Sequence, residues 1–385
     1  MLSSEPPPRP VSPSADAIRD AFDAAAPYTV GLEDEVMLLD PETLHLVPRA
    51  TQVISQIGED ARFKLEFPAS QLEILTQPAV DIASAATALV EARRDLARAT
   101  DGRMRLAASG FHPFSRPLGE SNPAPRYAHT RREYGSVAAR QLVCALQVHV
   151  SVGSAERALA VYNALRAELP LLAALAANAP FYEGEDTGLA SVRPKISELL
   201  PRQGVPPSID TWESYAEALR WGMAAGVLPS GNAWWWELRP HPSFGTLELR
   251  VPDAQTTVAD AAAVAAVVQA LVAWLGDRHD AGEVLAPAPT WRIEENRWSA
   301  CRHGVEGTMA DLRTGARRPT RDLLHALLDT LASTASNLGG AAALDRARAL
   351  VEVNGAMNQR AIATDRGMLG LVRWLAERFL DDPAA

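Results

Sequence analysis

The stretch YTVGLEDEVMLLD, residues 28–40, alternates between apolar and polar positions in the way that a half-buried β-strand does. Because strand side chains point to opposite faces in turn, Glu33 and Glu35 project from the same face. Two neighbouring carboxylates resist burial unless a cation neutralises them, and Mg2+ prefers such oxygen ligands. An edge strand with one solvent-exposed face is the alternative interpretation. The opposite face is apolar and consists of Val30, Leu32, Val36 and Leu38.

The composition of the chain limits its partners and its compartment. Its 385 residues are 47% hydrophobic and 22% charged, which is ordinary for a globular protein with a substantial core. The formal net charge of −10 argues against a nucleic-acid or anionic membrane partner, so an anionic ligand needs a local group of cations. Cys144 and Cys301 form neither a metal-binding spacing nor a disulfide framework, which fits a reducing compartment. No apolar run approaches the roughly 18 residues of a spanning helix, and the N-terminus lacks a signal sequence. We therefore expect a cytoplasmic protein.

The order of local patterns divides the chain into a tail and one domain. Residues 1–26 are rich in proline and serine and are predicted to be a disordered tail, with a short helix over 15–25 as an alternative. Residues 27–385 are predicted to form a single catalytic domain whose last part, about 291–380, is mainly helical. The segment 184–207 has the glycines, prolines and length of a functional loop. Further strands are predicted over 44–47, 64–76, 104–110, 142–152 and 234–253, further helices over 82–99, 155–169, 170–178, 212–225 and 258–274, a polar loop from 110 through 122, and a linker over 276–289.

The later strands also carry polar residues spaced by two positions, so that each pair shares a face. A sheet that is apolar behind and carries carboxylates and arginines in front suits metal and phosphate binding, because arginine forks meet phosphoryl or carboxylate oxygens bidentately. Neither a GxxxxGK[ST] segment nor a Rossmann fingerprint follows a strand, so a nucleotide would bind in another manner. The polar positions are Glu73 on the second strand region, Gln147 and His149 on the third, and Glu237, Arg239, Glu248 and Arg250 on the last pair.

Each of these patterns has a plainer alternative. A Glu-x-Arg triplet on a strand can be a cross-strand ion pair, and a histidine between valines can be a hydrogen-bonded core residue. The run Trp234–Trp236 is more typical of packing than of a base-stacking surface. Their convergence on one sheet favours the functional interpretation and indicates a metal-dependent enzyme that handles phosphate.

Longer motifs then make the chain similar to the bacterial glutamate–cysteine ligase type 2 family, whose members are also described as carboxylate–amine ligases. The resemblance covers nearly everything from residue 28 to the C-terminal helices. So many motifs in order are far more specific than one short pattern. They are TVGLEDEVMLLDPET, SQLEILTQP, QVHVSVG, LLAALAANAPFYEGEDTGLASVR, WWWELRPHPSFGTLELRVPD and NRWSACRHGVEG.

The resemblance implies a fold and a reaction. The fold would be α+β, with an antiparallel sheet curved around an active-site cavity as in the glutamine synthetase catalytic fold, and with helices packed outside. The cofactors would be ATP and Mg2+, and the substrates a small amino-acid carboxylate, by default glutamate, and an amine. The γ-phosphoryl group would pass to the carboxylate, and the amine would then attack the acyl phosphate to give an amide.

The resemblance also assigns roles to individual residues. Arg250 falls on the catalytic arginine expected to stabilise the transferring phosphoryl group, a role that electrostatics demands in such chemistry. Arg193 and Arg239 are further candidates for binding phosphate or the substrate carboxylate, and Glu66 is a further acidic candidate. The family's metal positions fall on Glu33, Glu35, Glu73 and Glu248, with His149 beside them at the metal–phosphate site.

Two departures from the family's pattern leave alternatives open. Asp34 stands on the apolar face of the first strand, and residues 194–207, PKISELLPRQGVPP, differ from the usual members where substrate is expected. A ligase of the same mechanism that joins another amino acid or natural-product carboxylate and amine is therefore the nearest alternative. A phosphotransferase and a catalytically inactive binding module are alternatives from other classes. The sequence also leaves a homodimer open.

Overall fold

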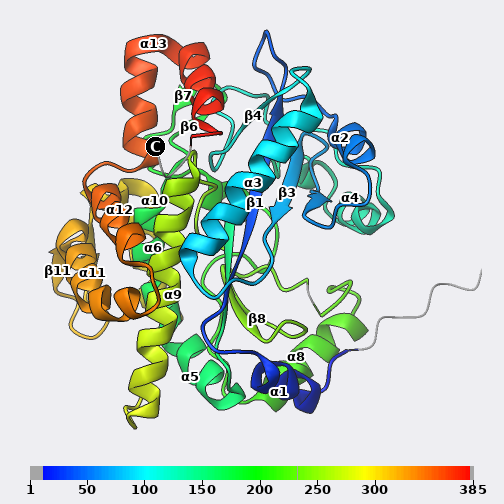
Figure 1. Ribbon diagram of the computed structural model, residues 1–385. Helices are drawn as coiled ribbons and strands as arrows, with labels where there is room; N and C mark the ends of the chain where they lie inside the picture. The colour runs from blue at the N-terminus through cyan, green and yellow to red at the C-terminus, as the bar shows by residue number, and fades with distance from the viewer. Residues whose placement is uncertain (1–11, 232, 382–385) are drawn as a thin grey trace, which may run out of the picture.

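The computed structural model describes residues 12–231 and 233–381. Within them, seven strands form one antiparallel sheet with helices around it, which confirms the α+β class (Figure 1). The order across the sheet is β2 (Phe63–Leu65), β3 (Gln71–Leu75), β1 (Val30–Leu39), β5 (Leu146–Ser151), β9 (Thr246–Leu249) and β8 (Leu238–His241), with β4 (Arg105–Ala107) paired to the end of β1.

Two long helices cover the apolar face of the sheet. The helix α3 (Ile82–Thr100) contacts β1 and β3, and α9 (Val258–Asp280) contacts β5 and α3 (Figure 1). Each begins at a side chain that accepts a hydrogen bond from an otherwise unpaired backbone amide, Asp81 for α3 and Thr257 for α9. The apolar residues of β1 therefore pack against helices, while Glu33 and Glu35 face the other way.

The helix α9 is apolar on nearly every side. By length and composition, it and the stretch 155–175 could each cross a membrane, so the prediction that no run approaches that length was wrong. In α9, 83% of the apolar window is buried inside the molecule. A helix that is hydrophobic all round is what a central position in a large core requires. In this chain, α9 packs against α3, α5 (Ala155–Leu165), α11 (Thr320–Asn337) and α12 (Ala341–Glu352).

The other elements surround this core. One cluster of buried apolar residues runs from Ile18 to Phe379, so the first and last described helices share a core. The two small hairpins are β6 (Phe181–Tyr182) with β7 (Glu185–Asp186) and β10 (Thr308–Ala310) with β11 (Arg317–Pro319). The remaining helices are α2 (Ala50–Ile57), α4 (Pro125–Ala138), α6 (Leu169–Leu175), α7 (Arg193–Ser197), α8 (Trp212–Ala224), α10 (Thr290–His303) and α13 (Gly355–Arg378), with 3-10 turns at Arg166–Glu168 and Gly304–Glu306.

The N-terminal segment differs from the predicted disordered tail. Residues 1–11 of that tail lie outside the described residues. From Ala15 to Ala24 the chain forms the helix α1, the alternative that the sequence left open. Ile18 and Phe22 are fully buried, and the Phe22 ring lies 5.0 Å from that of Trp212 in α8. The tail prediction was wrong over this helix because two apolar side chains, one turn apart, dock it on the core.

Two predicted elements also have other bounds in the structure, and one helix was not predicted. The helix α9 continues to Asp280, so the predicted linker over 276–289 begins later. The helix α4, which follows the polar loop predicted through residue 122, was not predicted, because it carries no apolar stripe by which its sequence could have been recognised. The strand predicted over 44–47 is reduced to a single bridge between Leu46 and Leu39.

The departure at Asp34 has a structural explanation. Its side chain is fully buried on the apolar face and accepts a hydrogen bond from Nε of Arg93 in α3, 2.9 Å away. The other Arg93 donors bond the backbone carbonyls of Gln255, Thr256 and Phe379. This buried pair therefore ties the strand that carries Glu33 and Glu35 to α3, to the segment before α9 and to the C-terminal helix. Breaking one partner of such a pair leaves an uncompensated charge in the core.

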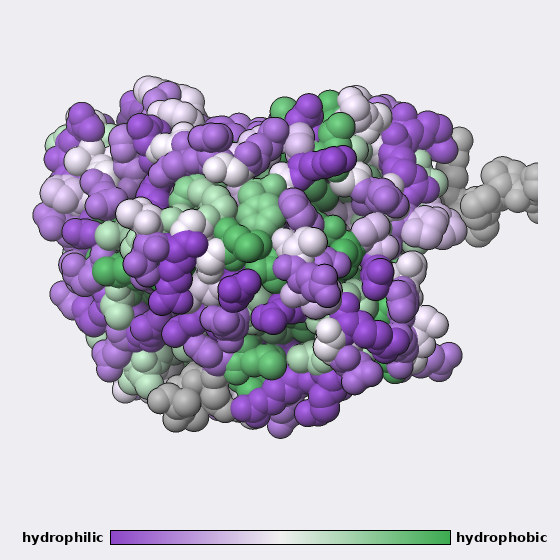
Figure 2. All heavy atoms as spheres, turned by 90° about the horizontal axis from the view of Figure 1, so that it is seen from above, coloured by the Kyte–Doolittle hydropathy of each residue, from purple (hydrophilic) through white to green (hydrophobic). Residues whose placement is uncertain are grey.

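The surface carries a mixture of residue types. On the face seen from above in Figure 2, hydrophilic residues dominate the rim and apolar residues gather in the middle. Some large apolar side chains are exposed singly, among them Trp221, Phe244 and Trp291, at 64%, 58% and 66%. Such isolated exposure is normal for a globular protein. Cys144 and Cys301 are buried and unpaired with each other, as predicted.

Candidate active site

The register of the sheet brings the predicted polar residues onto one face. Glu35 on β1 lies opposite Glu73 on β3, and Glu33 lies opposite Gln147 on β5. His149, also on β5, lies opposite Glu248 on β9, which in turn lies opposite Arg239 on β8. The shared faces predicted from the sequence are therefore confirmed. Because neighbouring strands are about 4.8 Å apart, these side chains stand within reach of one another across the sheet.

Glu33, His149 and Glu248 form what we call the histidine cluster. Their candidate ligand atoms all lie within 4.8 Å of one another. Nδ1 of His149 is 3.0 Å from the Thr246 hydroxyl, which fixes the ring orientation. Its Nε2 is buried, has no hydrogen-bond partner among the described residues, and lies 3.3 Å from Glu33 Oε1. A buried imidazole nitrogen turned toward two carboxylates is arranged as a metal ligand would be.

Two arginines balance the charge of the histidine cluster. Nε of Arg239 and Nη1 of Arg250 each lie 2.6 Å from one oxygen of Glu248. Burial alone would raise the pKa of Glu248, but these arginines and His149 hold that pKa far below its usual value. For Glu33, burial is likewise outweighed by His149 and Arg250, and the pKa falls to about 2. Both carboxylates are therefore ionised at neutral pH.

Glu35, Glu66 and Glu73 form what we call the carboxylate cluster, again with candidate ligand atoms within 4.8 Å. Glu66, the further acidic candidate, lies between β2 and β3, where the strand predicted over 64–76 is interrupted. Burial and the neighbouring Glu66 raise the pKa of Glu35 to about 8. Burial, Glu66, Glu33 and Glu35 raise the pKa of Glu73 well above its usual value. The donors to Glu35 are neutral amides, the backbone of Ala145 and the side chain of Gln147.

The side chain of Gln147 lies between the two clusters. Its Nε2 is 2.9 Å from Glu35 Oε1 and 3.2 Å from Glu73 Oε1, and its Oε1 accepts a hydrogen bond from Nη1 of Arg250. One amide thus orients residues of the carboxylate cluster and the arginine that touches the histidine cluster. The two groups are neighbouring parts of a single polar face.

Both clusters fit divalent cations by the chemistry of their donors. Carboxylate oxygens suit hard divalent cations such as Mg2+. Three crowded carboxylates, two of them buried and Glu66 half-buried, stay ionised together only when positive charge neutralises them. The unpartnered Nε2 of His149 adds a nitrogen ligand that the protein itself does not satisfy. The predicted metal residues are therefore brought together, as two groups, and Glu66 joins the second.

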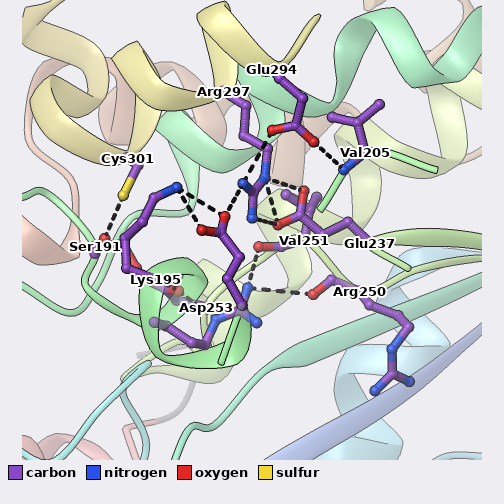
Figure 3. A network of polar contacts seen from close by, with 12 residues as sticks. Ser191, Lys195, Val205, Glu237, Arg250, Val251, Asp253, Glu294, Arg297 and Cys301 are labelled. Carbon is purple, nitrogen blue, oxygen red and sulfur yellow. Dashed lines mark hydrogen bonds and ion pairs between the residues drawn. The ribbon is translucent and has the colours of Figure 1, made fainter. Parts of the chain in front are cut away.

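Arg250 combines a fixed position with donors directed away from the protein. Its hydrogen bonds to side chains of the described residues leave from Nη1, and its side chain remains 23% exposed. In Figure 3, its guanidinium points away from the neighbouring Arg297 network. The rest of its fork is therefore available to a ligand in the adjoining cavity.

A cavity of about 200 Å³ joins Arg250 to the carboxylate cluster. Tyr127 and Trp235 contribute aromatic surface, and the loop after Arg193 contributes Ser197, Leu200 and Gln203. The segment 184–207 therefore contributes to the cavity, but it is not a loop throughout, because it contains β7 and the helix α7. Trp235 carries the Arg202 guanidinium over its ring at 5.5 Å, whereas Trp234 packs against Tyr215. Trp234 therefore packs inside the fold, as the packing interpretation of the tryptophan run predicts, whereas Trp235 lines the cavity.

Arg193 and Arg239 are both held by acidic partners. Nε of Arg193 is 2.7 Å from Asp253, and its Nη2 donates to the carbonyls of Arg250 and Val251. Asp253 also accepts from the Ser191 hydroxyl at 2.9 Å. Arg193 therefore lines the cavity while bracing the end of β9. Arg239 is braced by Glu248, so the cross-strand ion pair that the sequence left open is present there.

A second network, around Arg297 in α10, was not assigned a role from the sequence. Arg297 is buried and makes paired contacts of 2.6 to 2.9 Å with both oxygens of Glu237, which lines the cavity (Figure 3). Glu198 and Glu294 also contact Arg297, and Glu294 accepts from the backbone of Val205. The residue lies within the motif NRWSACRHGVEG, which was the available signal, but its partners are far away in the sequence.

Two solved structures share this fold. A glutamate–cysteine ligase from Francisella tularensis in complex with AMP superposes with a TM-score of 0.67 at 12% identity, covering 92% of this chain and 89% of that one. A bifunctional glutathione synthetase from Pasteurella multocida gives a TM-score of 0.66 at 15% identity and covers 95% of this chain and 53% of that one. At these identities the likeness concerns the fold alone, and it supports the α+β fold, with an antiparallel sheet and helices packed outside, that the resemblance implied.

Relatives at higher identity extend along nearly the whole chain. A protein of Rubrobacter xylanophilus, named "Putative glutamate--cysteine ligase 2-3", is 39% identical over 371 residues, covering 92% of this chain and 98% of its own. A "Putative glutamate--cysteine ligase 2" of Gloeobacter violaceus is 33% identical and covers 91% and 96%. The family model described as Glutamate-cysteine ligase family 2 (GCS2) matches residues 29–372. The chain therefore belongs to glutamate–cysteine ligase family 2.

Proposed function

We propose that the protein is an ATP- and Mg2+-dependent ligase that joins an amino-acid carboxylate, with glutamate as the default, to an amine. The observation that carries the proposal is the pair of acidic clusters, linked through Gln147 and Arg250, on one face of the sheet beside a cavity. Family membership supports ligase chemistry, and the AMP bound to the Francisella tularensis enzyme supports a nucleotide substrate. The proposed setting is the cytoplasm, with small-molecule substrates and without nucleic-acid or membrane partners.

The two clusters would divide the work of holding cations. Glu33, His149 and Glu248 would form one site, and the carboxylate cluster would form the other. Bound Mg2+ would neutralise phosphate oxygens and so lower the electrostatic cost of phosphoryl transfer. Arg239 and Arg250 keep Glu248 ionised and oriented for this purpose. Gln147 holds Glu35 in register with Arg250.

The reaction would proceed in two balanced steps. An oxygen of the substrate carboxylate attacks the γ-phosphorus of ATP. The bond between that phosphorus and the bridging oxygen breaks, so ADP leaves and an acyl phosphate forms. Free donors of Arg250 face the cavity in which this transfer would occur, where an arginine fork stabilises charge on the phosphoryl oxygens. The amine nitrogen then attacks the acyl carbon, phosphate leaves, and the amine loses a proton. Activation by ATP is required because an amine does not displace oxygen from a free carboxylate at useful rates.

The proposal is tested by measuring ADP release from ATP and Mg2+ across amino acids offered singly and in pairs. We expect release to require a carboxylate substrate, with glutamate foremost, and to increase when an amine is added. Glu35→Ala and Glu248→Ala should abolish the signal while the protein remains folded. Release that yields a stable phosphorylated product without any amine would favour a phosphotransferase. Absence of ADP release with every pair would contradict the ligase assignment.

A different carboxylate or amine remains the closest competing proposal. It is favoured by the segment 194–207, which lines the cavity through Ser197, Leu200 and Gln203 and departs from the family's pattern. The same panel separates the two cases, because the pair of substrates with the highest kcat/KM identifies the preferred acid and amine.

A further inference from the structure

The tip of the β8–β9 hairpin holds an exposed aromatic ring beside the histidine cluster. Phe244 is 58% exposed, and its ring stacks on that of His241 with centroids 4.0 Å apart and planes at 10°. The same ring lies 5.9 Å from His149, a member of the cluster. Among the exposed large apolar side chains of the described residues, Phe244 has this ring contact to the histidine cluster. A single exposed apolar side chain is common on protein surfaces, but an exposed ring in contact with a candidate active site points to a ligand.

The hairpin tip is fixed rather than free to swing. The Phe244 amide donates to His241 Nδ1 at 3.2 Å, and the Gly245 amide donates to the His241 carbonyl at 3.1 Å. Gly245 has a φ of +62°, and a Cβ there would lie 2.1 Å from the carbonyl oxygen of Ala21 in α1. Both the positive φ and the close approach of α1 therefore require glycine at this position. The close contact with α1 also holds the turn in place. The Phe244 ring is presented in a defined orientation.

The stacking partner leaves one face of the ring available. His241 covers one face of Phe244, while the other is not covered by a stacked ring in the described part of the chain. A purine base is a flat ring that stacks on aromatic side chains, and such stacking is sequence-tolerant and strong enough to position a nucleotide. A nucleotide with phosphates at the histidine cluster would place its ribose and base over a neighbouring part of the surface, and the Phe244 ring, 5.9 Å from His149, belongs to that surface.

We propose that Phe244, supported by His241, is the stacking surface for the purine base of the nucleotide whose phosphates bind at the histidine cluster. This inference rests on the proposed function, because that function supplies the nucleotide. It goes beyond that function by assigning the base to the hairpin tip. The base would thus lie on β8 and β9, whereas the cavity beside the carboxylate cluster would remain for the other substrates.

The experiment compares the binding of MgADP and of magnesium pyrophosphate to the full-length protein by titration calorimetry. Pyrophosphate probes the phosphate site without a base. Phe244→Ala should weaken ADP binding by roughly 5- to 150-fold, the range known for losing one base–aromatic stack. It should leave pyrophosphate binding unchanged. Phe244→Tyr keeps a stacking ring and should retain ADP affinity.

Trp291→Ala is the matched control, because Trp291 is 66% exposed and belongs to α10. It should change neither affinity. Unchanged ADP affinity in Phe244→Ala would overturn the inference while leaving the proposed function standing. Equal losses for ADP and pyrophosphate would also overturn it, since they would indicate a distorted histidine cluster. A wild-type protein that binds neither ligand would contradict both proposals. If Phe244→Ala changed the sedimentation coefficient but not the ADP affinity, Phe244 would be a contact between copies of the chain and the inference would be wrong.

Discussion

The two acidic clusters occupy the same face of the same sheet, yet their electrostatics are opposite. Glu33 and Glu35 are two positions apart on β1, and each belongs to a different cluster. Around Glu33, contacts with His149 and Arg250 outweigh burial, and the pKa lies at about 2. Around Glu35, burial and Glu66 dominate, and the pKa lies at about 8. A shift of two positions along one strand therefore separates an ionised carboxylate from one that holds its proton at neutral pH.

The difference shows what each cluster needs from a ligand. The histidine cluster has two arginines within ion-pairing distance of Glu248, so the folded protein already balances its charge. The carboxylate cluster receives neutral amide donors at Glu35, so its charge must be balanced by something that binds. We infer that the first cluster is assembled before any cation binds, whereas the second becomes fully ionised only with a cation. The predictions below test this contrast.

The largest expected effect is on the arginine that touches the histidine cluster. Arg250→Lys keeps a positive charge but loses the fork that reaches both Glu248 and the cavity. We expect kcat to fall by roughly two to four orders of magnitude, the range for removing a key electrostatic stabiliser, with little change in the KM for ATP. Steady-state kinetics with varied ATP measures both. Arg278→Lys, at the exposed end of α9, should behave like the wild type.

A raised KM for ATP with normal kcat at saturation would contradict this role. It would mean that Arg250 contributes equally to binding in the ground state and the transition state.

Removing one carboxylate from each cluster should have opposite effects on stability. Glu248→Gln leaves Arg239 and Arg250 without their shared carboxylate, which should lower the free energy of unfolding by about 3 to 5 kcal/mol. Glu73→Gln removes a carboxylate that burial and its neighbours disfavour, so the metal-free protein should be unchanged or more stable. Chemical denaturation in EDTA measures both variants. Equal losses for the two variants would show that the clusters do not differ in charge balance.

The pH dependence of stability should separate the clusters next. Since the pKa of Glu35 is about 8 in the folded chain and near its usual 4.5 when unfolded, the folded state retains this proton longer. Stability should therefore fall as pH rises from about 4.5 to 8, by a few kcal/mol at most. In metal-free protein, the melting temperature of the wild type relative to Glu35→Gln should decline between pH 5.5 and 8.5.

Glu33→Gln provides the matched control for this measurement. The pKa of Glu33 is lowered to about 2, so its contribution to stability is present above about 4.5 and is lost only as pH falls toward 2. Relative to Glu33→Gln, the wild type should show no trend between pH 5.5 and 8.5. If the melting temperature of the wild type declined equally with pH relative to both variants, a group other than Glu35 would cause the pH dependence.

The smallest effect concerns the hydroxyl that orients His149. Thr246→Val removes the partner of Nδ1, 3.0 Å away, without touching a candidate ligand. Loss of such a supporting hydrogen bond should weaken Mn2+ binding at the histidine cluster by about 10- to 100-fold. The measurement is best made in a Glu73→Gln background, where the carboxylate cluster is impaired. Thr246→Ser keeps the hydroxyl and should bind Mn2+ normally. Normal Mn2+ binding by Thr246→Val would show that this hydroxyl does not orient His149 for metal binding.

The strands of the site could be predicted because their information is local. Alternation with a period of two placed Glu33 with Glu35 and Glu248 with Arg250, and the register confirms that these faces coincide. The same rule described Asp34 only as an exception on the apolar face. Its partner Arg93 belongs to α3, and no local pattern connects them.

The missing parts of the site depend on contacts between distant segments. Glu66 lies between β2 and β3, outside any strand, so the family resemblance named it as an acidic candidate but no strand period placed it in the carboxylate cluster. The pairing of Arg297 with Glu237 joins α10 to the segment before β8, which only the folded chain brings together. The helix α4 lacks an apolar stripe, and Tyr127 at its start lines the cavity. The division of the metal residues into two clusters likewise emerges from strand register, which a single sequence does not specify.

The most direct test of the account follows an isotope from the substrate carboxylate. The acid substrate is labelled with 18O in the carboxylate and supplied with ATP, Mg2+ and the amine. An acyl-phosphate route transfers one 18O atom to inorganic phosphate for each amide formed, because the carboxylate oxygen that attacks phosphorus leaves with it. We predict this label in phosphate for the wild type and its absence in Glu248→Ala. Label in AMP would indicate an adenylate route, and amide formation without label in phosphate would contradict the proposed mechanism.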